Sequence, residues 1–162
     1  MKKNLSKVLS FFAALTFFAP LSHANVAGNG LICLDKKIAN LGWSDANNPT
    51  IAYVAHWFDD ERVSTVTWTR KNDIINMIKS RGSIKYETDI STIFWSVKSP
   101  DGDRKIQINR STLVRSVIAD GEKINEVNCE LVSKEKDYTQ KLDSITSDIQ
   151  SKYDNAISAN KL

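Results

Sequence analysis

Between Gly30 and Val132 the sequence alternates short β-type runs with turn-forming residues, and this pattern constrains the fold more than any other feature. Residues 104–110 are the clearest run, because Ile106 and Ile108 fall on one face of an extended chain and polar residues on the other. Turns such as Ser99–Asp103 recur about every ten residues, which favours antiparallel hairpins over parallel βαβ units.

We therefore expect a mainly β fold, an antiparallel meander of about eight strands that forms a small barrel or curved sheet. The expected strands are rich in β-branched and aromatic residues. They are Leu31–Lys36, Tyr53–Phe58, Arg62–Thr69, Asp73–Ile78, Gly82–Thr88, Ser91–Val97, Arg104–Arg110, Thr112–Ala119 and Ile124–Val132. In the last strand, alternation places Val127, Cys129 and Leu131 on the inward face.

The periodicity changes after Ser133. Apolar residues then recur at steps of three and four, as on one face of a helix: Tyr138, Leu142, Ile145, Ile149, Tyr153 and Ile157. We expect one C-terminal α-helix from Lys134 to Ala159, with Ser133 as its N-cap. Its narrow apolar stripe leaves three interpretations open: docking on the sheet, binding a partner or self-associating, or forming a loosely attached tail.

The first 24 residues are typical of a bacterial secretory signal peptide. Lysines 2, 3 and 7 precede an apolar stretch, and a small-residue motif predicts cleavage between Ala24 and Asn25. The expected organisation is therefore a signal peptide at 1–24, a β domain at 25–132 and an amphipathic helix at 133–162. Such a chain is secreted or periplasmic, and no second apolar segment reaches the length of a membrane span.

The chain contains two cysteines, Cys33 and Cys129. An exported protein meets an oxidising environment, so the sequence predicts that these two residues form one disulfide. Because the pair lies in the first and last expected strands, the bond would join the two ends of the β domain.

The charge of the exported chain is balanced. The sequence has 22 basic and 19 acidic residues, and three of the lysines but none of the acids lie in the leader, which leaves 19 of each. No surplus of cations remains to neutralise phosphates, so we expect neither nucleic acid nor an anionic membrane surface as a partner.

The sequence offers little material for catalysis. Without the leader, His56 is the single histidine, and no serine lies in a nucleophile-elbow motif. One histidine and two oxidised cysteines cannot form a zinc site. We expect a non-enzymatic protein with no catalytic, cofactor-binding or metal-binding residues and no cofactor. The alternative is a glycan hydrolase in which two acidic side chains meet across the sheet.

Two adjacent aromatic residues, Phe94 and Trp95, must point to opposite faces of a strand. We expect one ring to fill the core and the other to lie under the C-terminal helix. An outward aromatic side chain would otherwise be an anchor for a protein or glycan.

With the strands placed, residues 57–132 resemble a type of small exported bacterial or phage-encoded protein with no assigned activity. The matching features are His56-Trp57-Phe58, Tyr86 before Phe94-Trp95, Ile108–Leu113 and Cys129–Val132. The Arg-x-Thr-Leu element within Ile108–Leu113 is the most specific of them. The resemblance implies no particular function.

The chain also resembles periplasmic inhibitors of C-type lysozyme, which have a small antiparallel barrel, one disulfide, a Ser-Gly-x-x-Tyr loop and a Phe-Trp strand followed by lysine. Here Gly82–Tyr86 inverts the Ser-Gly order and adds a residue, and Lys98 follows the Phe-Trp pair one place late. The resemblance implies that the serine and the lysine enter the lysozyme cleft. It nominates Ser83, Tyr86, Trp95 and Lys98 as binding residues.

Taken together, the sequence predicts an exported binding protein whose partner is a protein or glycan of the bacterial envelope or extracellular space. Lysozyme inhibition, glycan hydrolysis and a helix-mediated adaptor role are the alternatives, and self-association through the C-terminal helix is a further possibility.

Overall fold

The computed structural model describes residues 26–35, 53–80 and 82–159. The predicted signal peptide, its cleavage site at Ala24 and Asn25, and residues 36–52 lie outside the described residues.

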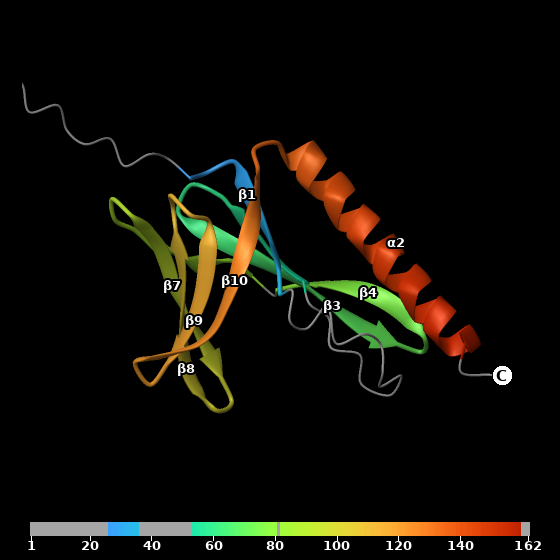
Figure 1. Cartoon of the computed structure of the whole chain (residues 1–162). Coiled ribbons are helices and arrows are strands. Elements are labelled where there is room, and N and C mark those ends of the chain that lie inside the picture. Colours follow the sequence, from blue (N-terminus) through green and yellow to red (C-terminus); the bar gives the residue numbers. More distant parts are fainter. Residues whose placement is uncertain (1–25, 36–52, 81, 160–162) are drawn as a thin grey trace, which may run out of the picture.

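The described chain forms one antiparallel sheet and one long helix (Figure 1). The strands are β1 (Asn29–Leu34), β2 (Tyr53–Phe58), β3 (Arg62–Lys71), β4 (Ile74–Lys79), β5 (Ile84–Lys85), β6 (Glu87–Thr88), β7 (Thr92–Ser99), β8 (Gly102–Asn109), β9 (Val114–Ala119) and β10 (Glu122–Val132), followed by the helix α2 (Glu135–Ala159). The sheet order is β4-β3-β2-β1-β10-β9-β8-β7-β6, with β5 off this path beside β3. Strands adjacent in this order are also consecutive in the chain, except where β1 joins β10. The predicted mainly β meander with a C-terminal helix is confirmed.

The sheet curls into a half-barrel, and the segment from β5 to β6 crosses from β3 to β7. β5 pairs with β3 through Arg62↔Lys85 and Val63↔Ile84. β6 pairs with β7 through Glu87↔Phe94 and Thr88↔Ile93. The prediction of one continuous strand at 82–88 is therefore wrong, because the two halves of this segment hydrogen-bond to different partners.

Apolar side chains form a core on each face of the sheet. The concave interior contains the larger cluster: Leu31, Cys33, Phe58, Val63, Tyr86, Ile93, Trp95, Ile106, Ile108, Val117 and Val127. The opposite face of β1, β2, β3, β4 and β10 packs against α2, which runs along it away from β7, β8 and β9 (Figure 1). The residues of β10 that were predicted to face inward differ in burial. Val127 is buried, whereas Leu131 is 48 % exposed at the open end of the half-barrel.

Of the three interpretations of the helix, the structure supports docking on the sheet. Tyr138, Leu142, Ile149 and Tyr153 are buried. The helix begins at Glu135, and the amide of Tyr138 donates to the carbonyl of Lys134. Lys134 rather than Ser133 therefore occupies the N-cap position, because the N-cap carbonyl accepts the first bond of the helix.

The aromatic prediction is half correct. Trp95 fills the concave core, but Phe94 lies beneath the ammonium group of Lys105, 4.2 Å from its ring centre, rather than beneath the helix. The rings under α2 come from β2 and β3. Trp57 contacts Tyr138 at 5.1 Å between centroids, and the indole N–H of Trp68 donates to the hydroxyl of Thr146 at 2.8 Å.

Cys33 and Cys129 form the predicted disulfide. They lie directly opposite each other in β1 and β10, the strands that begin and end the β domain. The bond therefore reinforces the pairing of β1 with β10, whose cysteines are 96 positions apart in the sequence.

Candidate functional site

A small apolar cavity opens at one end of the half-barrel. It has a volume of about 200 Å³, and we call its residues the mouth cavity: Val26, Asn29, Leu31, Phe58, Ile93, Arg110, Leu113 and Leu131. Six of these side chains are apolar, and Arg110 supplies the one charge among them. The cavity is thus an apolar recess with one cationic side chain, that of Arg110, in its lining.

The turn between β8 and β9 builds one wall of this cavity. The side-chain oxygen of Asn109 accepts hydrogen bonds from the amides of Ser111 and Thr112, each at 2.9 Å. Leu113 then adopts a positive φ of 54°, a conformation that costs a non-glycine residue about 1–2 kcal/mol. Bonds to Asn109 and Cys129 hold its backbone there. The strained conformation is thus held in place by the surrounding structure, with the Leu113 side chain at the mouth.

Arg110, in the same turn, donates from Nη1 to the carbonyl of Asp89 at 3.0 Å. Its own amide donates to the carbonyl of Ser91. These bonds anchor the turn to the loop between β6 and β7 and place the guanidinium beside the apolar lining. The mouth is therefore a preformed feature of the fold.

The interior holds a polar pair. His56 is 1 % exposed, its Nδ1 lies 3.1 Å from the hydroxyl of Thr65, and its Nε2 accepts a hydrogen bond from Nε of Arg115 at 3.0 Å. Burial, together with the nearby charge of Arg115, holds the pKa of His56 well below its usual range. Burial also lowers the pKa of Arg115 to about 10. His56 is therefore neutral and acts as an acceptor for a buried cation.

Two of the four binding residues suggested by the lysozyme-inhibitor resemblance are buried. Trp95 packs edge-on against His56 and Phe58 in the concave core. Tyr86 lies between β5 and β6, and its hydroxyl donates to the carbonyls of Asp59 and Asp60. Both side chains therefore close and fill the half-barrel, a structural role.

The other two, Ser83 and Lys98, are not among the residues that line the mouth cavity. Ser83 is partly exposed and Lys98 is exposed. The β6–β7 pairing ends at Glu87↔Phe94 and does not extend to Ser83, because β5 pairs with β3, whereas Lys98 pairs with Asp103 of β8. The loop does not stand free of the barrel, because the carbonyl of Ser83 accepts a 2.7 Å hydrogen bond from Arg62.

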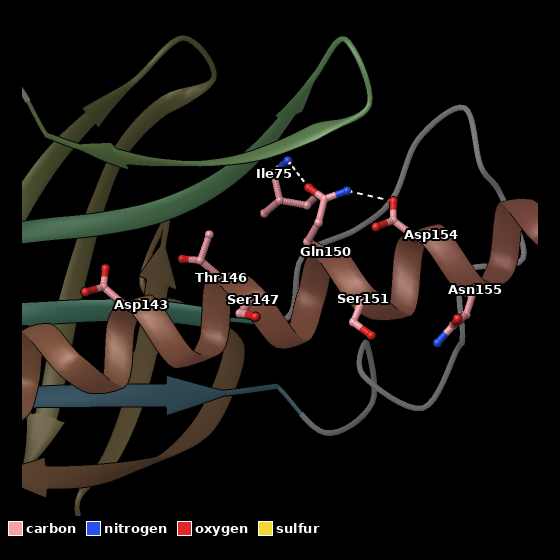
Figure 2. A pocket seen from close by; sticks show the side chains of 8 residues that line it. All are labelled: Ile75, Asp143, Thr146, Ser147, Gln150, Ser151, Asp154 and Asn155. Atoms are coloured by element: carbon pink, nitrogen blue, oxygen red, sulfur yellow. Dashed lines mark hydrogen bonds between the residues drawn. The ribbon is translucent and has the colours of Figure 1, made fainter.

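A second, polar hollow of about 610 Å³ lies between α2 and β4. Figure 2 shows its lining, which is Ile75 and seven polar residues of the helix, and the bonds that Gln150 makes to Ile75 and Asp154. Two acids and no base are among them. This hollow belongs to the contact between the helix and the sheet edge.

Over residues 26–35, 53–80 and 82–159, no group of three histidine, cysteine or acidic side chains is placed to hold a metal ion. In the same ranges, no helix is both long and apolar enough to cross a membrane. The acids of the turns Asp59–Glu61 and Asp101–Asp103 are exposed.

Sequence reasoning missed the residues that form the mouth. The Ile108–Leu113 element stood out as a motif, yet its spacing did not reveal that Arg110 and Leu113 would meet Leu31 and Leu131. The pairing of His56 with Arg115 was also missed. The available signals were an asparagine before a turn, and a charged residue, Arg115, in a strand that is mostly apolar.

No family model, curated protein or solved structure matches this chain. The two resemblances noted from sequence motifs therefore stay predictions.

Proposed function

We propose that this chain is a non-enzymatic binding protein of the bacterial periplasm or extracellular space, and that the mouth cavity receives one apolar side chain of a protein partner. The observation that carries the proposal is the strained Leu113 held at the rim of an apolar recess. Strained backbone that the surrounding structure enforces is commonly found at functional sites.

The size of the cavity favours a protein partner. Sites for small molecules usually enclose about 300–1,000 Å³. The mouth cavity, at about 200 Å³, is smaller. Protein interfaces, in contrast, often depend on one large apolar anchor in a well-packed pocket. Leu131, which is 48 % exposed at the rim, adds apolar surface around such an anchor.

The lining residues also favour recognition over catalysis. Arg110 is the only titratable residue among them, so the cavity offers no pair of groups for general acid and base chemistry. The Cys33–Cys129 disulfide supports an oxidising compartment.

The test uses N-acetyl-leucine amide and N-acetyl-phenylalanine amide as probes, titrated into isotopically labelled protein and followed by NMR. We expect saturable shifts at the amides of Leu31, Ile93 and Leu113, and both probes recovered unchanged. Leu131→Asp should weaken binding about ten-fold or more, because it places a charge at the apolar rim.

Ile124→Asp is the matched control, since Ile124 lies on the same strand and is 53 % exposed. It should leave probe affinity unchanged. Absence of saturable binding, or equal losses in the two variants, would refute the mouth as the binding site.

A second candidate, lysozyme inhibition, draws support from the accessibility of two residues that the resemblance nominates, since Ser83 is partly exposed and Lys98 is exposed. A lysozyme assay with the purified protein tests it. Inhibition that is lost in both Ser83→Ala and Lys98→Ala, and kept in Ser96→Ala on the exposed side of β7, would favour this function over mouth binding. No inhibition at micromolar protein would exclude it.

A further inference from the structure

The outermost strand on the helix side of the sheet, β4, has a strand on one side only among the described residues. It pairs with β3 and is the last strand in the sheet order. Three of its six residues are large exposed hydrophobics: Ile74 at 58 %, Met77 at 40 % and Ile78 at 49 %. An exposed apolar edge strand is a template for pairing with another strand.

The hydrogen bonds of β4 identify which backbone groups face outward. The amide of Ser80 donates inward to the carbonyl of Thr65, whereas the amide of Ile75 donates outward to Oε1 of Gln150 at 2.8 Å. Amides alternate in direction along an antiparallel strand. The amides of Met77 and Lys79 therefore also face outward, and in the described part of the chain they have no acceptor.

The helix protects only the beginning of this edge. Gln150 accepts a hydrogen bond from the amide of Ile75 (Figure 2). It also donates to the carbonyl of Asp73, so its side chain occupies the position that a neighbouring strand would take there. Beyond it, no described strand pairs with the edge from Met77 to Lys79. A pairing strand is thus restricted to the second half of β4.

We propose that β4 pairs with β4 of a second copy of this chain, antiparallel and with the twofold axis at Ile78. In this register Met77 of each copy exchanges both backbone hydrogen bonds with Lys79 of the other. The two Ile78 residues form the central, non-hydrogen-bonded pair, in which side chains lie closest. Ile75 takes no part, so Gln150 stays in place.

Charge supports a second copy as the occupant. The chain without its leader carries equal numbers of basic and acidic residues, and a net charge near zero favours association. Lys79 faces Met77 of the other copy, so the two lysines are not directly opposed. The contact is small compared with the 1,200–2,000 Å² of stable interfaces, so the dimer is weak and depends on concentration. Four residues of the apolar stripe of α2 are already buried, so the proposed contact does not involve that stripe.

Cross-linking through introduced thiols tests the register. The native protein has no free cysteine in the described ranges, so Ile78→Cys and Ile74→Cys each add one reactive thiol to the oxidised protein. Directly opposed residues have Cβ atoms about 4.5–5.5 Å apart, within reach of a disulfide after small adjustment.

We expect Ile78→Cys to form disulfide-linked dimers about ten-fold faster or more than Ile74→Cys, which lies four residues from the axis. Peptide mapping confirms that the bond joins the two introduced thiols. Equal rates for the two variants would overturn the register.

Sedimentation equilibrium of the unmodified protein provides the second measurement. Met77→Lys puts a second cation opposite Lys79 and should raise the dimer dissociation constant about ten-fold or more. Ile124→Lys adds the same charge on β10, at similar exposure, and should leave it unchanged. A protein that stays monomeric at millimolar concentration, or equal effects of the two substitutions, would overturn the proposal. Probe binding at the mouth is independent of either result.

Discussion

Nε of Arg115 donates a hydrogen bond to Nε2 of His56 across 3.0 Å in the concave core, although the residues lie 59 positions apart in the chain. The bond fixes the neutral state of the histidine, because a protonated ring could not accept it. Its Nδ1–H then faces the hydroxyl of Thr65. The core of the half-barrel thus contains a titratable group that must stay uncharged.

Stability should fall in mild acid because of His56. Its pKa in the folded protein lies well below the value of about 6.5 in the unfolded chain, so the unfolded chain binds the proton first as pH falls. The contribution of neutral His56 to the free energy of unfolding is complete above about pH 6.5. It declines below that pH, by at most about 1.4 kcal/mol per pH unit.

Urea unfolding of the wild type and of His56→Gln, measured from pH 7.5 down to 4.5, checks this prediction. The difference between the two curves cancels the titration of the acidic residues. As pH falls below 6.5, the free energy of unfolding of the wild type should decrease relative to that of His56→Gln. Parallel curves for the two proteins would contradict the prediction.

Loss of the hydroxyl should have different effects on stability at two tyrosines of α2. The hydroxyl of Tyr138 is buried and has no hydrogen-bond partner among the described residues. Tyr138→Phe should therefore leave stability unchanged or raise it by up to about 1 kcal/mol. The hydroxyl of Tyr153 donates to Asp73 at 2.6 Å and accepts from Arg70 at 2.8 Å, so Tyr153→Phe should destabilise the protein. Thermal unfolding of both variants provides the comparison, and equal losses would contradict the assignment.

Gly30 is needed for the helix to dock. A Cβ at this position would overlap the ring of Tyr138 and approach Trp57, so Gly30→Ala should cost about 1–3 kcal/mol through overpacking. The cost should largely disappear in a Tyr138→Ala background, since the obstacle is gone. Chemical denaturation of the four proteins in this cycle measures the coupling, and an undiminished cost in the double variant would place the strain elsewhere.

Loss of the disulfide should lower stability substantially. The bond closes a loop with a sequence separation of 96 residues, for which chain entropy gives about 4–5 kcal/mol at most. The double variant Cys33→Ala with Cys129→Ala should therefore unfold at lower urea concentration than the oxidised wild type. Reductant should shift the wild type towards the variant and leave the variant unaffected. A reductant-insensitive wild type, or free thiols in the purified protein, would contradict the bond.

Much of the fold could be predicted because strands and turns are specified locally. The range Tyr53–Phe58 was predicted as observed, and the last strand ended correctly at Val132. The segment 82–88 was misjudged because its composition is uniformly β-like, whereas its division into β5 and β6 depends on where β3 and β7 lie. Tyr86 and Trp95 were nominated as binding residues for a similar reason, since a sequence motif does not show which face of a strand is enclosed.

The sequence by itself determined the elements of this protein: the alternating strands, the change of period at the helix, and the single possible cysteine pair. These depend on spacing along a few residues, which the chain carries wherever it folds. Only the tertiary structure decided that the sheet curls around His56 and Arg115, that Leu31, Leu113 and Leu131 meet at a mouth, and that β4 is left at an edge. Those relationships join residues far apart in the chain, and the curvature and order of the strands set them.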